Sequence, residues 1–240
     1  MTPQELQEHQ LKTQKTLQSE VKKNKSITLS VDCTIFGFDN GQLKILVIKS
    51  DYEAYQNQFS LIGDLVHPNE DTDQAAIRIL YERTALSSIY LGQVKTYGKV
   101  DRHPAGRVVT IAYCALVNVS HYQLSIDANE LQWINYTDIH TMAFDHKQIA
   151  ADCRQWLQHT VINQPTAFYL LPKKFSLREV QNLYSAILGE DLDRRNFRKK
   201  ILSLGFLIDI NQMEKDVTHR PGKLYKLDTK SKLPLASVLK

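Results

Sequence analysis

Strand-like runs of apolar residues begin at about residue 26. Residues 26–49 read SITLSVDCTIFGFDNGQLKILVIK, two β-rich runs around the pair Asn40 and Gly41. An Asn-Gly pair supplies the positive φ angles that a two-residue hairpin turn needs. Residues 90–101, 106–119 and 130–139 have the same strand character. The pattern predicts a β-hairpin followed by further strands.

Helical spacing interrupts these strands. Asp71 or Thr72 can cap a helix that follows the hairpin. Residues 145–162 place four apolar side chains at mostly helical spacing: Ile149, Cys153, Trp156 and Val161. Strands combined with such helices predict an α/β (α+β) fold for this part of the chain, an α/β/α sandwich around a mixed sheet.

The last third of the chain has a different rhythm. Ser176 begins a helix that Gly189 ends, and Asp193 begins a basic helix that Gly205 closes. On the basic helix Phe197, Ile201 and Leu204 form the buried stripe. Two strand-like runs follow at 206–210 and 222–228. Helix, short loop, basic helix and β-hairpin are the order of a winged helix-turn-helix.

Charge divides the chain at the same place. Residues 166–240 carry 15 Lys and Arg against 8 Asp and Glu, a net charge of +7, whereas residues 1–165 carry 15 against 18, a net charge of −3. The polar break NQPT ends just there. We therefore expect an N-terminal helix or arm over 1–25, a first domain over 26–165, and a C-terminal domain over 166–240 with a polyanionic partner.

Composition excludes several classes of protein. The three cysteines, Cys33, Cys114 and Cys153, are odd in number and far apart, which argues against a disulfide framework or a zinc knuckle. The N-terminus has no apolar core like that of a signal peptide, and no apolar run approaches the roughly 18 residues of a membrane span. We expect a cytoplasmic protein with no membrane partner.

The stretch IGDLVHPNEDTDQAAIRILYERTAL, residues 62–86, resembles the Nudix box, written G-x5-E-x7-R-E-U-x-E-E-x-G-U with U aliphatic. Five positions match: Glu70, Arg78, Leu80, Glu82 and Leu86. Four depart from the motif: Asp64 stands at the first glycine with Gly63 just before it, Ile79 and Arg83 replace glutamates, and Ala85 replaces the last glycine. An amphipathic helix after a loop could give as many matches, so the strands on both sides carry the assignment.

The departures remove a metal site. Residues 79, 82 and 83 lie at i, i+3 and i+4, where Nudix enzymes place the glutamates that bind Mg²⁺. Ile79 offers no ligand, and Arg83 brings a positive charge where the cation would sit. The box therefore predicts no Nudix-type hydrolysis or only a trace of it, with no catalytic residue, no metal and no other cofactor.

The whole chain resembles the NrtR family of Nudix-related transcriptional regulators. The resemblance covers about residues 26–228 and rests on SVDCTIFGF, the degraded box, DRHPAGRVVTIAYCAL, AFDH, LLPKKFSLREVQNLYSAILGEDLDRRNFRKKI and RPGKLYKL. It implies a homodimer that binds a palindromic double-stranded DNA operator through the winged helix and responds to a small-molecule effector. That effector is ADP-ribose in the branch that regulates NAD metabolism, and the pentose arabinose in a branch that regulates sugar metabolism. The sequence leaves both open.

The candidate effector-binding residues are Arg78, Glu82, Arg83, Asp101, Arg102 and Arg107. The four arginines could hold a diphosphate by forked hydrogen bonds, which slightly favours a nucleotide. Against this, Arg78 in a Nudix box usually braces the loop, and arginines that flank a turn, such as Arg102 and Arg107, are commonly solvated.

The candidate DNA-binding residues are Lys173, Lys174, Arg194, Arg195, Asn196, Arg198, Lys199, Lys200, Arg220 and Lys223. An α-helix fits the major groove, where Arg reads guanine and Asn reads adenine, so Arg195, Asn196 and Lys199 are the first candidates for contacts at or near bases. The wing, with Lys215, His219, Arg220 and Lys223, would lie along the backbone or the minor groove.

Two other functions fit the same sequence. A Nudix hydrolase of ADP-ribose or a similar nucleoside diphosphate derivative could use Glu70, Glu82 and a further carboxylate such as Asp64 or Asp101 as an atypical metal site. A protein-interaction module could retain a winged helix that no longer binds DNA. Metal-dependent turnover would identify the first, and salt-sensitive, sequence-selective DNA binding would exclude the second.

Overall fold

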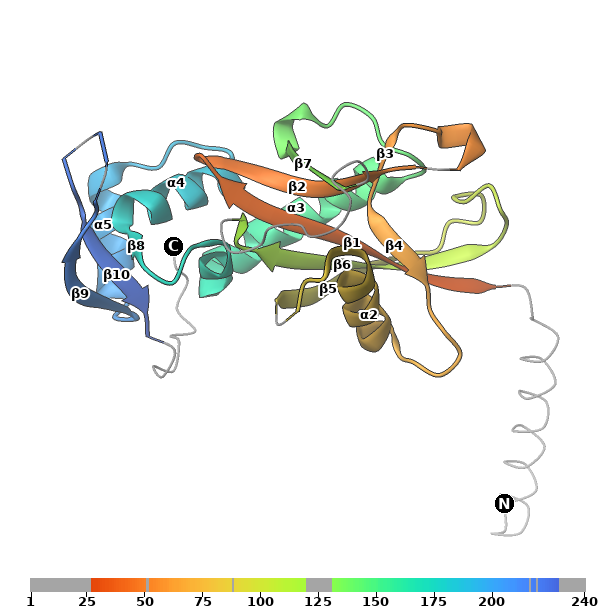
Figure 1. The fold of residues 1–240 in the computed structure, drawn as a ribbon, viewed down its shortest axis with the longest axis horizontal. Helices are drawn as coiled ribbons and strands as arrows, with labels where there is room; N and C mark the ends of the chain where they lie inside the picture. The colour runs from red at the N-terminus through yellow and green to blue at the C-terminus, as the bar shows by residue number, and fades with distance from the viewer. Residues whose placement is uncertain are drawn as a thin grey trace, which may run out of the picture.

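The computed structural model describes residues 27–50, 52–87, 89–119, 131–215, 217–218 and 220–228. Within these ranges a mixed sheet with helices on both faces precedes a small winged helix-turn-helix, and the two parts lie end to end (Figure 1). The arm predicted over 1–25 and the wing residue His219 lie outside the described residues.

The large sheet has seven strands, and β1 (Thr28–Asp39) lies at its centre. The order is β3-β2-β1-β6-β5, with β4 also paired to β1 and β7 to β2. Only β1 and β6 among these pairs run parallel. The strands are β2 (Gln42–Lys49), β3 (Phe59–Ser60), β4 (Ile62–Leu65), β5 (Tyr90–Tyr97), β6 (Val108–Val117) and β7 (Leu131–Asn135).

The predicted hairpin is confirmed. β1 and β2 pair antiparallel from Asp39 opposite Gln42 onward. Between them Asn40 has φ 50° and Gly41 has φ 77°, the positive values that a tight primed turn requires. The hairpin thus follows from two residues whose side chains tolerate this backbone.

One helix covers each face of the sheet, so the predicted sandwich is confirmed. α2 (Thr72–Thr84) packs Ile79, Leu80 and two alanines against one face. α3 (His146–Asn163) packs Ile149, Cys153, Leu157 and Val161 against the other. Asp71 is the N-cap of α2 and shares a reciprocal capping box with Gln74, as the sequence indicated for the start of this helix.

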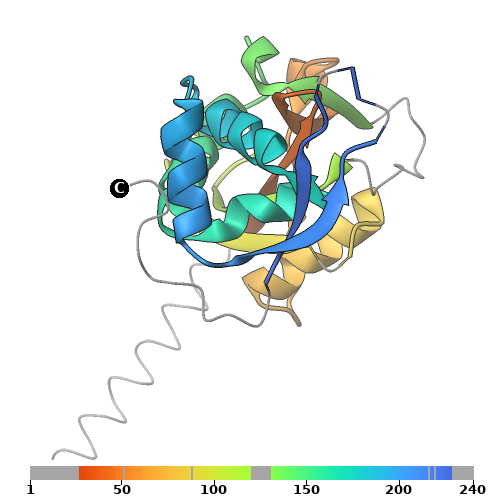
Figure 2. The same cartoon turned by 90° about the vertical axis from the view of Figure 1, so that its left-hand side faces the viewer.

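The C-terminal part is a winged helix-turn-helix, as predicted. Its elements are β8 (Phe175–Ser176), α4 (Leu177–Leu188), α5 (Arg194–Ser203), β9 (Leu207–Met213) and β10 (Lys223–Leu227). Ser176 caps α4 in a capping box with Glu179, Gly189 ends it at φ 79°, and Asp193 caps α5. β8, β10 and β9 form the second sheet in that order, and Figure 2 views this end of the molecule.

A single apolar core joins the two parts. The cluster under α3 continues without a break through the 3-10 segment η4 (Pro165–Leu170) into Phe175, Leu183 and Phe206 of the winged helix. Two further 3-10 turns, η1 (Glu53–Tyr55) and η3 (Tyr136–Asp138), lie in loops of the first part. No helix in the described ranges is long and apolar enough to span a membrane.

Candidate functional site

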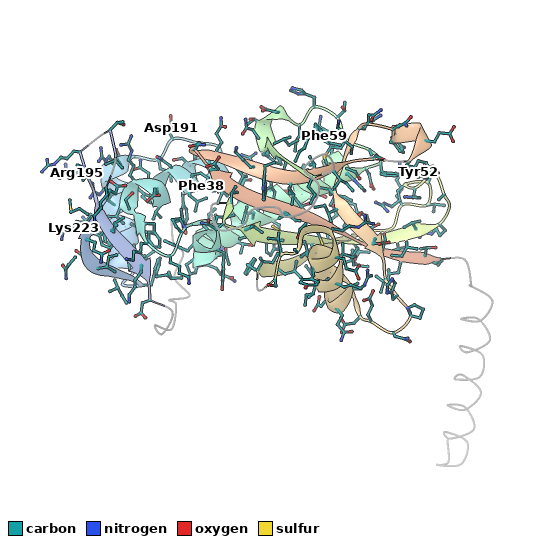
Figure 3. All side chains as sticks on the ribbon, viewed as in Figure 1. Phe38, Tyr52, Phe59, Asp191, Arg195 and Lys223 are labelled. Carbon is teal, nitrogen blue, oxygen red and sulfur yellow. The ribbon has the colours of Figure 1, made fainter. Side chains whose placement is uncertain are left out.

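A cavity of about 1300 Å³ lies at the end of the large sheet opposite the winged helix. Its floor is formed by polar side chains of two adjacent strands, Ser30 and Asp32 on β1 and Thr110 on β6. Its walls come from the loops that follow β2 and β5 and from the start of α3. Figure 3 labels Tyr52 on the wall, and Arg195 and Lys223 at the other end of the molecule.

A buried charge network anchors the floor. Arg102 donates from Nε and Nη2 to the two carboxylate oxygens of Asp145 at 2.8 and 2.6 Å, and from Nη1 to Thr110 at 2.5 Å. Its side chain is only 3% exposed. Of the two interpretations of Arg102, the solvated turn arginine is therefore wrong, because β6 and the start of α3 enclose the side chain.

His146, the first residue of α3, faces the same floor. Its Nδ1 accepts the backbone N–H of Leu61 at 3.0 Å, so the ring proton is on Nε2, which lies 3.6 Å from the Asp32 carboxylate. Burial lowers the pKa of His146, and the Arg102 charge lowers it further, although Asp32 and Asp145 act in the opposite direction. The imidazole is accordingly neutral at pH 7.

Aromatic rings form one wall of the cavity. His103 and Phe144 stack with centroids 4.8 Å apart and an angle of 10° between the rings, and Tyr52 meets both of them edge-on. All three line the cavity. Phe144 has φ 53°, a left-handed conformation that costs a bulky residue about 1–2 kcal/mol. A strained backbone of this kind persists only where surrounding contacts hold it, and it is common at ligand-binding sites.

Arg78 braces the box loop. It donates to the Glu70 carboxylate at 2.7 and 2.9 Å, to the carbonyl of Leu65 at 2.9 Å and to Glu82 at 3.1 Å. The Arg78 hydrogen bonds and the His67 N–H lower the pKa of Glu70 to about 2. Arg78 is not among the residues that line the cavity, so its contacts are those of a loop brace.

The three positions of the altered metal site, 79, 82 and 83, have different surroundings. Ile79 is 1% exposed and lies in the core under α2. Glu82 and Arg83 line the cavity, but Glu82 accepts a hydrogen bond from Arg78, and Arg83 Nη2 lies 3.7 Å from Asp64. No group of three or more His, Cys, Asp or Glu that could hold a metal ion occurs within the described ranges. Position 79 therefore lies in the core, and positions 82 and 83 lie at the cavity.

The remaining effector candidates divide in the same way. Arg107 lines the cavity, with Nη1 held by the carbonyls of Gly98 and Lys99 at 2.7 and 3.3 Å. Asp101 lies outside the cavity lining, is 75% exposed and faces Lys99 at 3.7 Å. The structure therefore brings Glu82, Arg83, Arg102 and Arg107 to one cavity and leaves Arg78 and Asp101 outside it.

Sequence reasoning missed several lining residues: Asp32, Lys49, His103, Phe144 and His146. One signal was available. Asp32 is the one charged residue between positions 26 and 38, and a charged residue at a buried strand position is informative in itself.

The basic helix presents its cations outward, as its apolar spacing indicated. Phe197 and Ile201 are buried, whereas five of the named polar residues are exposed, namely Arg194, Arg195, Asn196, Arg198 and Lys199. Lys200 is half-buried. Lys173, Lys174, Lys215, Arg220 and Lys223 are exposed around it, with Lys174 bonded to Gln212 at 3.0 Å and Lys223 paired with Asp209 at 2.8 Å.

A small basic groove connects this helix to the wing. Arg194 and Arg198 of α5 line it together with Arg220 and Lys223 of the wing region. Arg178, in the first turn of α4, is a further lining cation that sequence reasoning missed. Glu214 is the acidic residue of the lining, so the five cations give the groove a positive charge that suits a phosphate.

Two protein-family models match the chain. Residues 27–157 match the NUDIX domain, and residues 167–227 match the NrtR DNA-binding winged helix domain. The ADPR responsive transcriptional repressor NtrR of Acinetobacter baylyi is 32% identical over 203 residues, which cover 82% of this chain and 81% of that protein.

Two solved structures are similar. The crystal structure of Shewanella oneidensis NrtR complexed with a 27mer DNA has a TM-score of 0.75 and 28% identity, covering 83% of this chain and 93% of that one. The NUDIX domain of the same protein, complexed with ADP ribose, has a TM-score of 0.51 and 29% identity, covering 57% of this chain and 92% of that one. With a Nudix domain followed by this winged helix along most of its length, the chain belongs to the NrtR family.

Proposed function

We propose that this protein is a transcriptional repressor that binds an operator through its winged helix and responds to ADP-ribose bound in the cavity of its Nudix domain. One observation carries the proposal: a large cavity and a basic helix-turn-helix lie at opposite ends of one continuous core. The similarity to an ADPR responsive repressor and to structures with DNA and with ADP ribose supports both halves.

The DNA-binding half rests on the exposed face of α5. Arg195, Asn196 and Lys199 project from a helix whose opposite side is buried against α4. We assign base or near-base contacts to these three residues and phosphate contacts to the cations of the basic groove. A palindromic operator would be bound by a homodimer in the cytoplasm, each copy reading one half-site.

The effector half rests on the mixed lining of the cavity. Lys49, Arg83 and Arg107 provide cations that can neutralise a diphosphate, and the rings of His103, Phe144 and Tyr52 can pack against a base or a sugar. The volume of about 1300 Å³ is ample for a dinucleotide-sized ligand. A free pentose is the competing effector, and it would leave these three cations without a phosphate to bind.

We further propose that the Nudix domain does not hydrolyse its ligand. Of the three ligand positions in the box, Ile79 is in the core, Glu82 is bonded to Arg78, and Arg83 is cationic. Mg²⁺ needs oxygen ligands, and these three side chains offer one carboxylate between them. An assay for products from ADP-ribose with Mg²⁺ or Mn²⁺ tests this, and turnover on the order of 1 s⁻¹ would overturn it.

Fluorescence polarisation tests the regulatory function. Labelled DNA from upstream of the protein's own gene is titrated with the full-length protein, with and without ADP-ribose. We expect salt-sensitive, sequence-selective binding and a shift in operator affinity of at least fivefold with the ligand. Unchanged affinity with ADP-ribose but a shift with ribose or arabinose would identify a pentose effector instead. Absence of selective DNA binding would refute the proposal.

A further inference from the structure

The carboxylate of Asp32 lies at the cavity floor without a hydrogen-bond donor. The residue is 7% exposed, and its Oδ2 lies 3.6 Å from His146 Nε2 and 3.8 Å from Arg102 Nη2, both beyond hydrogen-bonding distance. No residue within the described ranges donates a hydrogen bond to it. A carboxylate has about four acceptor positions, and leaving them unpaired in a buried site is unfavourable. Its acceptor capacity is therefore directed at the cavity.

The surrounding residues keep Asp32 in this state. Arg102 is committed to Asp145 by two hydrogen bonds, and the Nδ1 of His146 is held by the Leu61 N–H, so neither ring nor guanidinium is free to approach. Opposite Asp32 on β4 stands Gly63, and a Cβ there would lie 2.0 Å from Asp32 Oδ1. The glycine leaves the space that the carboxylate occupies.

The charges at the floor select the chemistry of the group that binds there. Asp32 and Asp145 are anions, Arg102 is a cation and His146 is neutral, so the floor has a net charge of −1. A phosphate would be repelled by Asp32. A metal ion would lie close to the Arg102 guanidinium, which is 3.8 Å from the same oxygen. A neutral donor fits, and hydroxyl groups donate strongly to a carboxylate.

The rings beside the floor favour a sugar as the source of those hydroxyls. His103 and Phe144 present a stacked pair on the cavity wall, and His146 lies 5.1 Å from Phe144, ring centre to ring centre. The C–H face of a sugar ring packs well against such apolar surfaces while its hydroxyls point to a polar group. The phosphate-binding cations are supplied by other elements, Lys49 at the end of β2 and Arg83 in the last turn of α2.

We propose that Asp32 is the residue that determines specificity for a sugar: its carboxylate accepts hydrogen bonds from adjacent hydroxyls of the terminal, unblocked pentose ring of the effector. This inference rests on the proposed function, because it takes ADP-ribose as the ligand of the cavity. It predicts that the protein prefers ADP-ribose to ADP, which lacks the terminal ring, and that Asp32 is the source of that preference.

Isothermal titration of the full-length protein with ADP-ribose and with ADP tests the inference. Asp32→Asn has nearly the same shape but removes the charge and one acceptor oxygen. Hydrogen bonds to a charged group are worth roughly 10- to 100-fold in affinity. We expect Asp32→Asn to weaken ADP-ribose binding at least tenfold, to change ADP binding less than threefold, and so to abolish the preference. The matched control is Asp101→Asn, which removes an exposed carboxylate outside the cavity lining, and its effect should stay under threefold.

Several results would overturn the inference. These are a wild-type protein that binds ADP and ADP-ribose equally, an Asp32→Asn variant that keeps the preference, or one that loses both ligands to the same extent. Should Asp32→Asn not fold by thermal melting, Asp32→Ser is measured in the same way. The wild type could instead bind ribose or arabinose but not ADP-ribose. A tenfold loss of affinity for that pentose in Asp32→Asn would then support the sugar site at Asp32 and refute only ADP-ribose as the effector. Binding of none of these ligands would refute both.

Discussion

The side-chain amide of Gln158 donates a hydrogen bond to the carbonyl of Ile187 at 2.9 Å, and it makes a second bond to Leu188 at 3.0 Å. Gln158 is on α3 of the Nudix domain, and these carbonyls are the last ones of α4 in the winged helix. The last four carbonyls of a helix lack partners within it, so a side chain from another domain completes α4. At its other end, α3 begins with His146, which lines the cavity of the Nudix domain.

Gln158→Ala should therefore weaken the connection between the domains. The two hydrogen bonds are partly buried, and their loss should lower the free energy of unfolding by about 1–2 kcal/mol. Under the proposed function, we expect the ADP-ribose-dependent shift of operator affinity to shrink as well. Urea denaturation and polarisation measure the two effects. Gln148→Ala is the matched control, because Gln148 lies on the same helix but bonds to the half-buried Asp152 in its own turn. Equal effects of both variants would argue against the role of Gln158.

Arg195→Ala should reduce operator affinity with the fold intact. Arg195 is exposed on the face of α5 opposite the buried Phe197. A bidentate contact with a base is worth about 1–3 kcal/mol, which is roughly 5- to 150-fold in the dissociation constant. Polarisation on the operator and on scrambled DNA separates a base contact from a phosphate contact. Unchanged binding to the operator would rule out this assignment.

Arg178→Ala should weaken binding to all DNA sequences alike. Arg178 lines the basic groove at the start of α4, where a phosphate would be held by its charge. Loss of one phosphate contact should make the negative slope of log association constant against log salt concentration less steep by about 1. Arg178→Lys retains the charge and should largely retain the slope. A loss confined to the operator would instead indicate base reading by Arg178.

Ala85→Gly should stabilise the protein. Ala85 ends α2 in the left-handed region with φ 57°, at the position where the Nudix box has glycine. A Cβ costs about 1 kcal/mol in this conformation, so glycine should raise the free energy of unfolding by roughly that amount. Thermal melting measures the gain. The reverse change Gly189→Ala, at φ 79°, should destabilise, because its Cβ would also lie 2.7 Å from Arg154.

His146 should make stability depend on pH. Burial lowers its folded pKa below the ordinary value of 6.5. The unfolded chain then binds more protons, so the stabilising contribution is complete above pH 6.5 and is lost as the pH falls toward the folded pKa. Asp32, Asp145 and Arg102 are the charged groups that face the ring. Urea denaturation at pH 8 and pH 5.5 measures the loss, and His146→Gln, which can still accept from Leu61, should reduce it.

His103 contributes in the same direction, because burial also lowers its pKa. The comparison with His146→Gln isolates the share of His146, and an unchanged pH dependence in that variant would assign the effect elsewhere.

Local features could be predicted from the sequence because neighbouring residues determine them. Asn40 and Gly41 tolerate the positive φ of the hairpin turn, and Ser176 and Asp193 accept the first N–H groups of their helices. The apolar spacing around Phe197 indicated which side of α5 is buried. In each case the relevant partners lie within about four positions in the chain.

The cavity could not be predicted in this way. Arg102 and Asp145 are 43 positions apart, and Ser30 and Thr110, which are hydrogen-bonded at 2.5 Å, are 80 apart. Ser30 and Thr110 meet because β1 pairs with β6 in parallel, and Arg102 and Asp145 meet because the loop before β6 lies against the start of α3; no local pattern specifies either contact. For this reason the sequence left open whether Arg102 is a solvated turn arginine or a binding residue, although it is buried in the structure.

The sequence by itself determined the first hairpin, the order of the main helices, the degraded Nudix box and the basic winged helix, since these depend on side-chain type and on spacing along the chain, whereas the short strands β3, β4 and β8 were not predicted. Only the tertiary structure decided that Ile79 belongs to the core, that Arg78 braces a loop, and that Asp32 faces a cavity without a donor. Burial and hydrogen-bond pairing across distant strands are properties of the folded chain, because a side chain acquires them only from residues brought to it by folding.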